Sequence, residues 1–270
     1  MNGAATTITD HEFYEFQQFA KRIAGIHLAP AKKALVCGRL AKRLRHHQLQ
    51  SYGEYMALLR DGREPAETQI ALDLLTTNET HFFREGVHFD LLHEFARSSS
   101  RPGGNFRVWS AACSSGEEPY SIAMVLGDAL GASGWEVLAS DRSTQVLNRA
   151  RRAQYDLARA KSIPPRFLRA CCEKGIGAQE GTFRIDPRLQ SRVHFRQINL
   201  NEQLPQVGSF DCIFLRNVMI YFELATKRQV VRRLLANLKP GGVFLVGHSE
   251  SLNGVVEDLH CLRPSVYRKP

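Results

Sequence analysis

The feature that most constrains the fold is an alternation of apolar runs with helix-like segments across residues 106–250. The runs that resemble strands lie at residues 106–112, 135–141, 192–200, 210–217 and 241–248. The segments with helical periodicity lie at residues 117–130, 144–153 and 223–238. Because strands that alternate with helices form βαβ units, we expect a doubly wound α/β domain with a parallel sheet. The closing stretch 259–269 is expected to add an edge strand.

The chain before this region has a different pattern, which predicts a small all-helical domain. Thr9 followed by Glu12 is a capping-box signature, and apolar residues at helical spacing come after it. Gly25 ends this first helix, and Pro30 opens the next one. The stretch 98-SSSRPGGN-105 is rich in Ser, Gly and Pro, which predicts a linker between the two domains.

These patterns divide the chain into three segments. We expect the helical domain over residues 1–92, the linker over 93–105 and the α/β domain over 106–270. The alternation breaks at 171-CCEKGIGAQEGTFRI-185, where three glycines precede short strand-like pieces. This break predicts a small antiparallel β-insert over about residues 165–198.

Charge and composition narrow the class of protein. The net charge is +9, and the stretch from Lys21 to His47 holds eight Lys or Arg residues and no acid. Such a block predicts an anionic partner, with a solvated helix face as the alternative. No apolar run reaches the roughly 20 residues that span a bilayer, and the first residues do not resemble a secretory signal. The six cysteines lack CxxC spacing, so we expect a cytoplasmic protein with reduced thiols and no structural metal.

The turn after the first strand, 110-SAACSSGEEPYS-121, predicts the kind of ligand. It holds one glycine, Gly116, followed by Glu117 and Glu118. Ligands of doubly wound sheets bind at the carboxyl ends of the strands, but two carboxylates in the first helical turn would repel a pyrophosphate. S-adenosylmethionine (SAM) fits better, because it carries a sulfonium and an α-ammonium group and no phosphate. Asp141 ends the second strand, where an acid can bond both ribose hydroxyls. A structural turn with capping acids is the alternative.

A third set of polar residues follows the fourth strand, in 214-FLRNVMIYF-222. Arg216, Asn217 and Tyr221 are expected at the same sheet edge as Gly116 and Asp141. Their position alone leaves two interpretations open. They belong to the ligand site, or else Arg216 and Asn217 close the strand while Tyr221 packs in the core.

Four motifs in this order resemble the signatures of the chemotaxis-receptor glutamate methyltransferases, the CheR-type enzymes. They are 76-TTNETHFFRE-85, 109-WSAACSSGEEPYSIAM-124, 213-IFLRNVMIYF-222 and 247-GHSESL-252. The basic stretch 25–45 also resembles the N-terminal domain of that family, so the resemblance covers nearly the whole chain. It implies a Rossmann-like SAM-dependent methyltransferase domain with a small β-insert, preceded by a small helical domain. The implied reaction forms γ-glutamyl methyl esters on cytoplasmic helices of chemoreceptors and leaves S-adenosylhomocysteine.

The resemblance also implies roles for individual residues. Cofactor binding is implied for Asn78, Thr80, Arg84, Glu117, Asp141, Asn199, Leu200, Arg216 and Asn217, with the first three reaching across from the helical domain. Within this set, Glu117 is expected at the amino-acid end of the cofactor, Asp141 at the ribose, and Asn199 and Leu200 beside the adenine. Arg84 and Tyr221 are implied to lie nearest the transferred methyl group.

Two further sets concern the receptor. Its acidic methylation helices are expected to meet the cations Lys32, Lys33, Arg39, Lys42, Arg43 and Arg45. The glycines Gly175, Gly177 and Gly181 resemble a loop with which some family members dock a short peptide at the receptor's C-terminus, which implies a pentapeptide-dependent member. A glycine-rich hairpin without a partner is the alternative for this loop.

A substrate glutamate, whose ordinary pKa is about 4.3, is already ionised at neutral pH, so the reaction needs no general base. Two alternative functions are those of a nucleic-acid methyltransferase and of a non-catalytic SAM-binding sensor. The first is favoured by the positive charge, but the Asn-Pro-Pro-aromatic motif and interleaved aromatic residues are absent. The second is disfavoured because the motifs are intact. We expect a monomer that neither binds nucleic acid nor inserts into a membrane.

Overall fold

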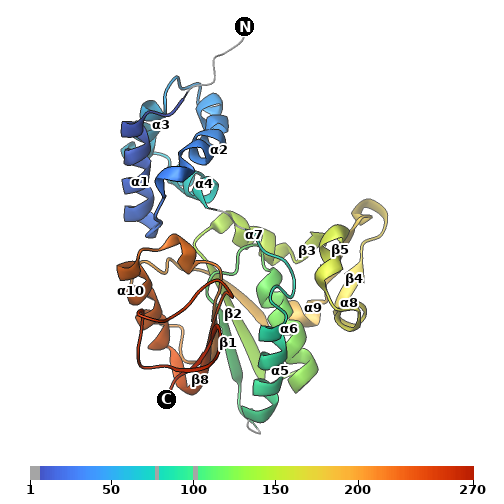
Figure 1. Cartoon of the computed structure of the whole chain (residues 1–270). Coiled ribbons are helices and arrows are strands. Elements are labelled where there is room, and N and C mark those ends of the chain that lie inside the picture. The colour runs from blue at the N-terminus through green and yellow to red at the C-terminus, as the bar shows by residue number, and fades with distance from the viewer. Residues whose placement is uncertain (1–6, 77–78, 100–102) are drawn as a thin grey trace. The chain divides into compact units, whose positions relative to one another are not determined.

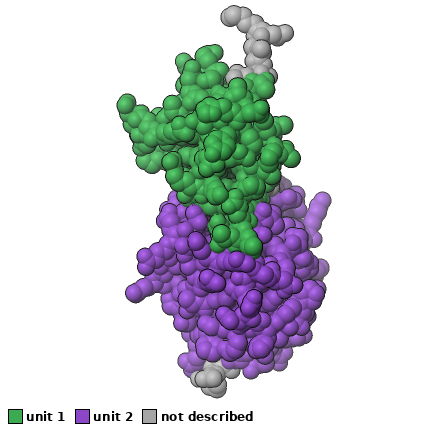
Figure 2. Space-filling view, turned by 60° about the vertical axis from the view of Figure 1, so that its left-hand side comes forward, with its two compact units in different colours: residues 1–78, 221–226 green, residues 79–220, 227–270 purple. Residues whose placement is uncertain are grey.

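The computed structural model describes residues 7–76, 79–99 and 103–270. The chain divides into two compact units, which Figures 1 and 2 show as ribbons and as filled spheres. The first unit comprises residues 1–78 and 221–226, and the second comprises residues 79–220 and 227–270. Among the described residues, no helix is both long enough and apolar enough to cross a bilayer.

The first unit is helical, as the sequence predicted. Its elements are α1 (Asp10–Ala24), η1 (Pro30–Lys32), α2 (Lys33–His46), α3 (Tyr52–Asp61) and α4 (Pro65–Leu75). The expected capping box is present, because the Thr9 side chain accepts from the Glu12 N–H and the Glu12 carboxylate accepts from the Thr9 N–H. The ring of Phe16 lies at the centre of the core, with its centroid 6.4 Å from that of Tyr52 and 6.3 Å from that of Tyr55.

A buried carboxylate, that of Glu67, joins three of these helices. It accepts hydrogen bonds from Arg43 Nε at 2.8 Å, Arg43 Nη2 at 2.5 Å and the Tyr55 hydroxyl at 2.5 Å. His47 Nε2 lies 3.2 Å from the same carboxylate. Burial raises the pKa of Glu67, but the hydrogen bonds from Arg43, Tyr55 and His47 outweigh it and lower this pKa to about 2. The charged form of Glu67 is therefore part of the folded unit.

The second unit is built on a seven-stranded sheet. Its strands are β1 (Phe106–Ser110), β2 (Trp135–Asp141), β6 (Val193–Gln197), β7 (Phe210–Leu215), β8 (Leu238–Val246), β9 (His260–Arg263) and β10 (Val266–Arg268), in the order β6-β2-β1-β7-β8-β10-β9. The first five of this order are parallel, while β10 runs antiparallel to β8 and to β9. The chain order reverses direction across the sheet at β1, which is the topological switch point. The predicted Rossmann-like fold is confirmed, and the closing stretch adds two strands rather than one.

Helices cover both faces of this sheet (Figure 1). They are α5 (Val87–Ser99), α6 (Glu117–Leu130), α7 (Thr144–Arg152) and α10 (Leu224–Leu235), with α5 and α6 packed together on one side. Helix α5 occupies much of the segment that was predicted as a linker at 93–105. Its side chains Phe89, Leu92 and Ala96 recur at helical spacing and are buried, so this helix packs into the core of the second unit. The chain divides near residue 78 instead.

The β-insert is a separate three-stranded antiparallel sheet in the order β3-β5-β4. Its elements are β3 (Gln154–Asp156), η2 (Leu157–Ser162), α8 (Pro165–Cys171), β4 (Cys172–Lys174), η3 (Gly177–Gln179), β5 (Thr182–Ile185) and α9 (Pro187–Gln190). The insert was expected at about 165–198, but it begins with β3, which is too short to show an alternating pattern. At the other end, β6 belongs to the large sheet.

Acidification is expected to destabilise the helical unit within a defined pH window. The folded-state pKa of Glu67 lies below its ordinary value of 4.5, so its stabilising contribution is complete above about pH 4.5 and is lost as the pH falls toward 2. Glu67→Gln should lower the free energy of unfolding at neutral pH by on the order of 2–3 kcal/mol and remove this pH dependence. Urea unfolding between pH 2 and 6 measures both effects.

The control for this measurement is Glu94→Gln, which removes an exposed acid in α5. It should unfold like the wild type at every pH. A Glu67→Gln variant that kept the wild-type slope of stability against pH would show that another group titrates in this window.

Candidate functional site

The carboxyl ends of the parallel strands bring most of the predicted residues to one edge of the sheet. This edge carries residues 111–116 after β1, Asp141 at the end of β2, Asn199 and Leu200 after β6, and Arg216 and Asn217 after β7. Backbone hydrogen bonds tie these segments together: Ala111 N–H donates to the Phe214 carbonyl at 2.9 Å, and Cys113 N–H donates to that of Ser140 at 2.9 Å. Ile198 N–H donates to the Asp141 carbonyl at 3.1 Å. This edge, at the switch point, is where a doubly wound sheet binds its ligand.

Strained backbone gathers at or beside the same edge. Phe83, Glu85, Ser114 and Asn217 have φ values of 53°, 60°, 47° and 56°, in the left-handed region that non-glycine residues seldom adopt. They are four of the seven such residues found in the part of the chain that the structure describes. Because such conformations persist only where the surroundings enforce them, their clustering indicates a functional site.

Gly116, the one glycine of the turn after β1, is required by close packing. Its φ is 97°, and a Cβ at this position would lie 2.8 Å from Ala150 Cβ and 2.8 Å from the Tyr155 hydroxyl. That hydroxyl donates to the Ser115 carbonyl at 2.8 Å. The turn therefore packs closely against α7 and β3, and its glycine serves that packing.

Glu117, the first residue of α6, is fully buried. Its carboxylate accepts from Ser115 Oγ at 2.7 Å and forms an ion pair with Arg159 of η2. Burial raises the pKa of Glu117, and the bonds from Ser115 and Arg159 offset this effect only in part. A buried carboxylate at this edge is suited to hold a cationic group such as an ammonium.

Arg216, after β7, is buried and lies between two acids. Its Nη1 donates to Glu118 at 2.9 Å, and its Nη2 donates to Glu85 at 2.9 Å and to the Arg84 carbonyl. Glu118 also accepts from Ser110 Oγ at 2.7 Å. Burial raises the pKa of Glu118 despite Arg216. At Glu85 burial acts in the same direction, but the hydrogen bond and charge of Arg216, together with bonds from His248 and Asn217, outweigh it and lower the pKa. Arg216 thus joins α6, β7 and the segment that carries Arg84.

Asp141 joins two loops of the edge. Its carboxylate accepts from the Ser114 N–H at 2.9 Å and from the Ser143 N–H at 2.9 Å. A carboxylate can accept several hydrogen bonds at once, which is the capacity that binding a ribose requires. Asp141 thus suits the ribose of SAM, and Glu117 suits its ammonium group. A phosphate would need bare amides at the start of α6, where this chain has Glu117 and Glu118.

Comparison with known families identifies the cofactor of this chain. Residues 78–267 match the family described as CheR methyltransferase, SAM binding domain, and residues 11–76 match CheR methyltransferase, all-alpha domain. The chain belongs to the CheR methyltransferase family. It is a SAM-dependent protein methyltransferase, and the predicted cofactor is confirmed.

Individual relatives show the same similarity over most of their length. The chain is 43% identical to the chemotaxis protein methyltransferase of Salmonella typhimurium over 263 residues, which cover 96% of this chain and 90% of that protein. It is 43% identical to the Escherichia coli protein of the same name over 249 residues, which cover 91% and 86%. It is also 43% identical to chemotaxis protein methyltransferase 2 of Pseudomonas aeruginosa over 246 residues, which cover 90% and 87%.

The TNETHFFR motif of this CheR family member lies partly at the edge. Arg84 belongs to the second unit, where its Nη1 donates to the Glu79 carbonyl at 2.9 Å, and Thr80 is half-buried in the same unit. The sequence had placed both in the helical domain. Phe82 anchors the motif, with its ring centroid 4.9 Å from that of Tyr155 and 5.7 Å from that of Phe183. Asn78 lies outside the described residues.

Tyr221 belongs to the first unit. Its carbonyl accepts from the His27 N–H at 2.7 Å, and the Lys32 ammonium lies 5.2 Å from the centroid of its ring. The next residue, Phe222, pairs with Ile26 in a short antiparallel bridge. The role of Tyr221 near the methyl group therefore stays a prediction.

Glu250 is a residue of the edge to which the sequence assigned no role, although its motif GHSESL stood out. It is buried, and its carboxylate accepts from the N–H groups of Asn217 at 2.7 Å, Gly247 at 2.8 Å and Ile220 at 3.2 Å. A Cβ on Gly247 would lie 2.5 Å from Asn217 Nδ2. Glu250 thus fixes the strained turn after β7. Its position directly after the fifth predicted strand, 241–248, is the sequence feature that could have identified it.

The basic block is only partly available to a partner. Arg43 is bound to Glu67, and Arg39 Nη1 donates to the carbonyls of Leu74 at 3.1 Å and Thr76 at 2.9 Å. Lys33 pairs with Asp10 at 2.6 Å. Lys42 and Arg45 are exposed on α2, one turn apart. The cations that the sequence grouped together therefore have different roles, because the face that each occupies on α2 decides its neighbours.

The glycines of the β-insert follow from the shape of its hairpin. A Cβ on Gly175 would lie 2.0 Å from the Gln179 carbonyl oxygen, and Gly177 and Gly181 have φ values of 58° and 81°. The turn between β4 and β5 therefore needs glycine at all three positions. Ile176, between the first two, has 82% of its surface exposed.

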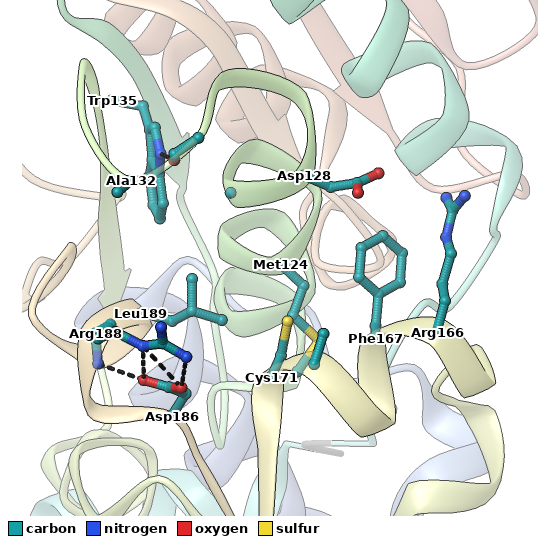
Figure 3. A pocket seen from close by; sticks show the side chains of 13 residues that line it. Met124, Asp128, Ala132, Trp135, Arg166, Phe167, Cys171, Asp186, Arg188 and Leu189 are labelled. Atoms are coloured by element: carbon teal, nitrogen blue, oxygen red, sulfur yellow. Dashed lines mark hydrogen bonds and ion pairs between the residues drawn. The ribbon is translucent and has the colours of Figure 1, made fainter.

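A separate pocket of about 460 Å³ lies beside the C-terminal half of α6 (Figure 3). Its lining includes Met124, Trp135, Phe167, Cys171 and Leu189, and the ion pair of Asp186 with Arg188 borders it. None of the predicted site residues lines it. Trp135 opens β2, so the pocket lies toward the amino ends of the strands, away from the candidate edge.

Proposed function

We propose that this methyltransferase forms γ-glutamyl methyl esters on the cytoplasmic helices of chemoreceptors. The observation that carries the proposal is the match of both units to the two CheR models, together with relatives named chemotaxis protein methyltransferase at 43% identity. The other product is S-adenosylhomocysteine. SAM supplies a methyl group on a sulfonium, which a carboxylate oxygen can attack in line.

In this proposal the described residues of the edge bind and position. Glu117 holds the α-ammonium of the cofactor, Asp141 holds the ribose, and Asn199 and Leu200 flank the adenine. The substrate glutamate arrives ionised, so the residues need to align it and exclude water rather than remove a proton. Arg84 is assigned to align the substrate carboxylate, since the strained residues on both sides of it fix its backbone.

Receptor recognition is assigned to the exposed face of α2. Lys42 and Arg45 have no partner among the contacts of the described residues, and Ala34 and Gly38 leave this face flat enough for a helix to approach. Acidic receptor helices would be attracted by the two cations, and the attraction would weaken as salt increases.

Asn217 and Arg216 remain assigned to the proposed cofactor pocket. Arg216 contributes there by holding Glu85 and Glu118 in place.

The reaction is tested with a radiolabelled methyl donor and a receptor cytoplasmic fragment. The label should enter the fragment and leave it under mild alkali as methanol, because esters hydrolyse where N-methyl groups do not. Arg84→Ala should lower kcat with both substrates saturating by about 100-fold, since a misplaced nucleophile loses alignment. Arg97→Ala, an exposed cation of α5, is the control. An unchanged kcat in Arg84→Ala would contradict its role, and an alkali-stable label would contradict the ester.

The receptor-binding face is tested by charge reversal at Lys42 and Arg45. The double variant to Glu should raise the KM for the receptor fragment about 10-fold at low salt, and the difference should shrink in 0.5 M salt. The Kd of S-adenosylhomocysteine should not change. The matched control reverses Arg149 and Arg152, which are exposed cations one turn apart on α7. An equal rise in KM in both variants would indicate net charge rather than a docking face.

We propose that the β-insert binds the receptor's C-terminal peptide as an added strand on the free edge of β4. Strand order β3-β5-β4 leaves this edge unpaired. The Gly175 N–H donates to the Thr182 carbonyl at 2.9 Å, so the N–H of the preceding residue, Lys174, points away from β5. The proposal rests on this edge and not on the three glycines, because the geometry of the turn is enough to require glycine at those positions.

This proposal predicts a specific sensitivity to proline. Calorimetric titration should detect binding of an aromatic-containing pentapeptide from a chemoreceptor C-terminus to the wild type. Lys174→Pro should abolish it by removing an outward N–H, and Lys174→Ala should retain it. No heat with the wild type would reject peptide binding and leave the methyltransferase assignment intact.

A further inference from the structure

Arg159 connects the β-insert to the candidate cofactor edge. It lies in η2, and its Nη1 donates to the buried carboxylate of Glu117. Beside this contact, the Tyr155 hydroxyl donates to the Ser115 carbonyl at 2.8 Å. Elements β3 and η2 of the insert therefore hold the turn after β1 through two separate contacts.

The two partners of the ion pair differ in freedom. Glu117 has no exposed surface and is fixed by Ser115 Oγ, whereas the Arg159 side chain is 46% exposed. A guanidinium has five N–H donors in a planar fork. The bond to Glu117 uses one of them, so Arg159 retains donors for a second anion while Glu117 stays in place.

The acids around the turn after β1 would make a cation at the position of Arg159 favourable for binding a second anion. Glu118 is paired with Arg216, and Asp141 accepts from two backbone amides, while Glu117 has Arg159. The amino-acid end of SAM carries an α-ammonium and an α-carboxylate. Glu117 matches the first, but an α-carboxylate beside three acids is repelled unless a cation offsets it.

We propose that Arg159 is a specificity-determining residue that binds the α-carboxylate of the cofactor while Glu117 binds its α-ammonium. The zwitterion then takes the place of the direct ion pair, and each of its charges meets the opposite charge. This inference rests on the proposed role of Glu117 at the amino-acid end of the cofactor. It makes the β-insert a contributor to cofactor binding as well as the proposed peptide site.

The test compares, by calorimetric titration, three thioether nucleosides that differ at the amino-acid end: S-adenosylhomocysteine, decarboxylated S-adenosylhomocysteine and 5′-methylthioadenosine. Arg159→Gln should raise the Kd of S-adenosylhomocysteine about 10- to 100-fold, as expected for a charge-assisted hydrogen bond. It should not weaken the binding of decarboxylated S-adenosylhomocysteine, which lacks the carboxylate, or of 5′-methylthioadenosine, which lacks the whole amino-acid end. Arg159→Lys should restore part of the affinity. Arg166→Gln, an exposed cation of α8, should bind all three ligands like the wild type.

Three outcomes would overturn the inference, and they are distinguishable. Unchanged or tighter binding of S-adenosylhomocysteine to Arg159→Gln would mean that Arg159 only shields Glu117. An equal rise in the Kd of all three ligands would mean that Arg159 holds the turn in place and does not bind the carboxylate. If the wild type bound none of the three, the proposed function itself would fail, and this inference with it.

Discussion

The candidate edge depends on one buried cation, the guanidinium of Arg216. It offsets the charges of Glu85 and Glu118 and reaches the backbone of Arg84. Removing one partner of such a buried network leaves uncompensated charge, which costs several kcal/mol. The same contacts hold α6, the end of β7 and the TNETHFFR motif in one arrangement. Arg216 is thus a structural centre of the site.

The fold could be predicted from the sequence because its signals are local and periodic. Strand β2 and helix α6 were predicted with the bounds that the structure shows, since each begins and ends at a change of pattern. Helix α5 was missed because the Ser- and Gly-rich stretch that follows its last buried residue, Ala96, drew the boundary to the wrong place. Strand β3 was missed because three residues cannot show alternation. Where one unit ends and the next begins depends on tertiary packing, which periodicity does not encode.

The candidate site was predictable in its residues but not in its connections. Strand-terminal positions and motif resemblance located Glu117, Asp141 and Asn217 at one edge. Two of these connections join segments that are distant in the sequence. Glu250 accepts hydrogen bonds from three backbone amides, and Arg159 forms an ion pair with Glu117. The basic block shows the converse: charge alone grouped Arg43 with Lys42, yet their directions on α2 make one a core ion pair and the other a surface cation.

The three glycines of the insert have a consequence for reading related sequences. Each is required by the backbone of the hairpin between β4 and β5, through a positive φ or the approach of the Gln179 carbonyl to Gly175. A relative that binds no peptide would still need them in order to close this loop. Conservation of these glycines among related sequences would therefore reflect the shape of the hairpin. Where a peptide partner is absent, the residues on the outward edge of β4 would be the first to vary.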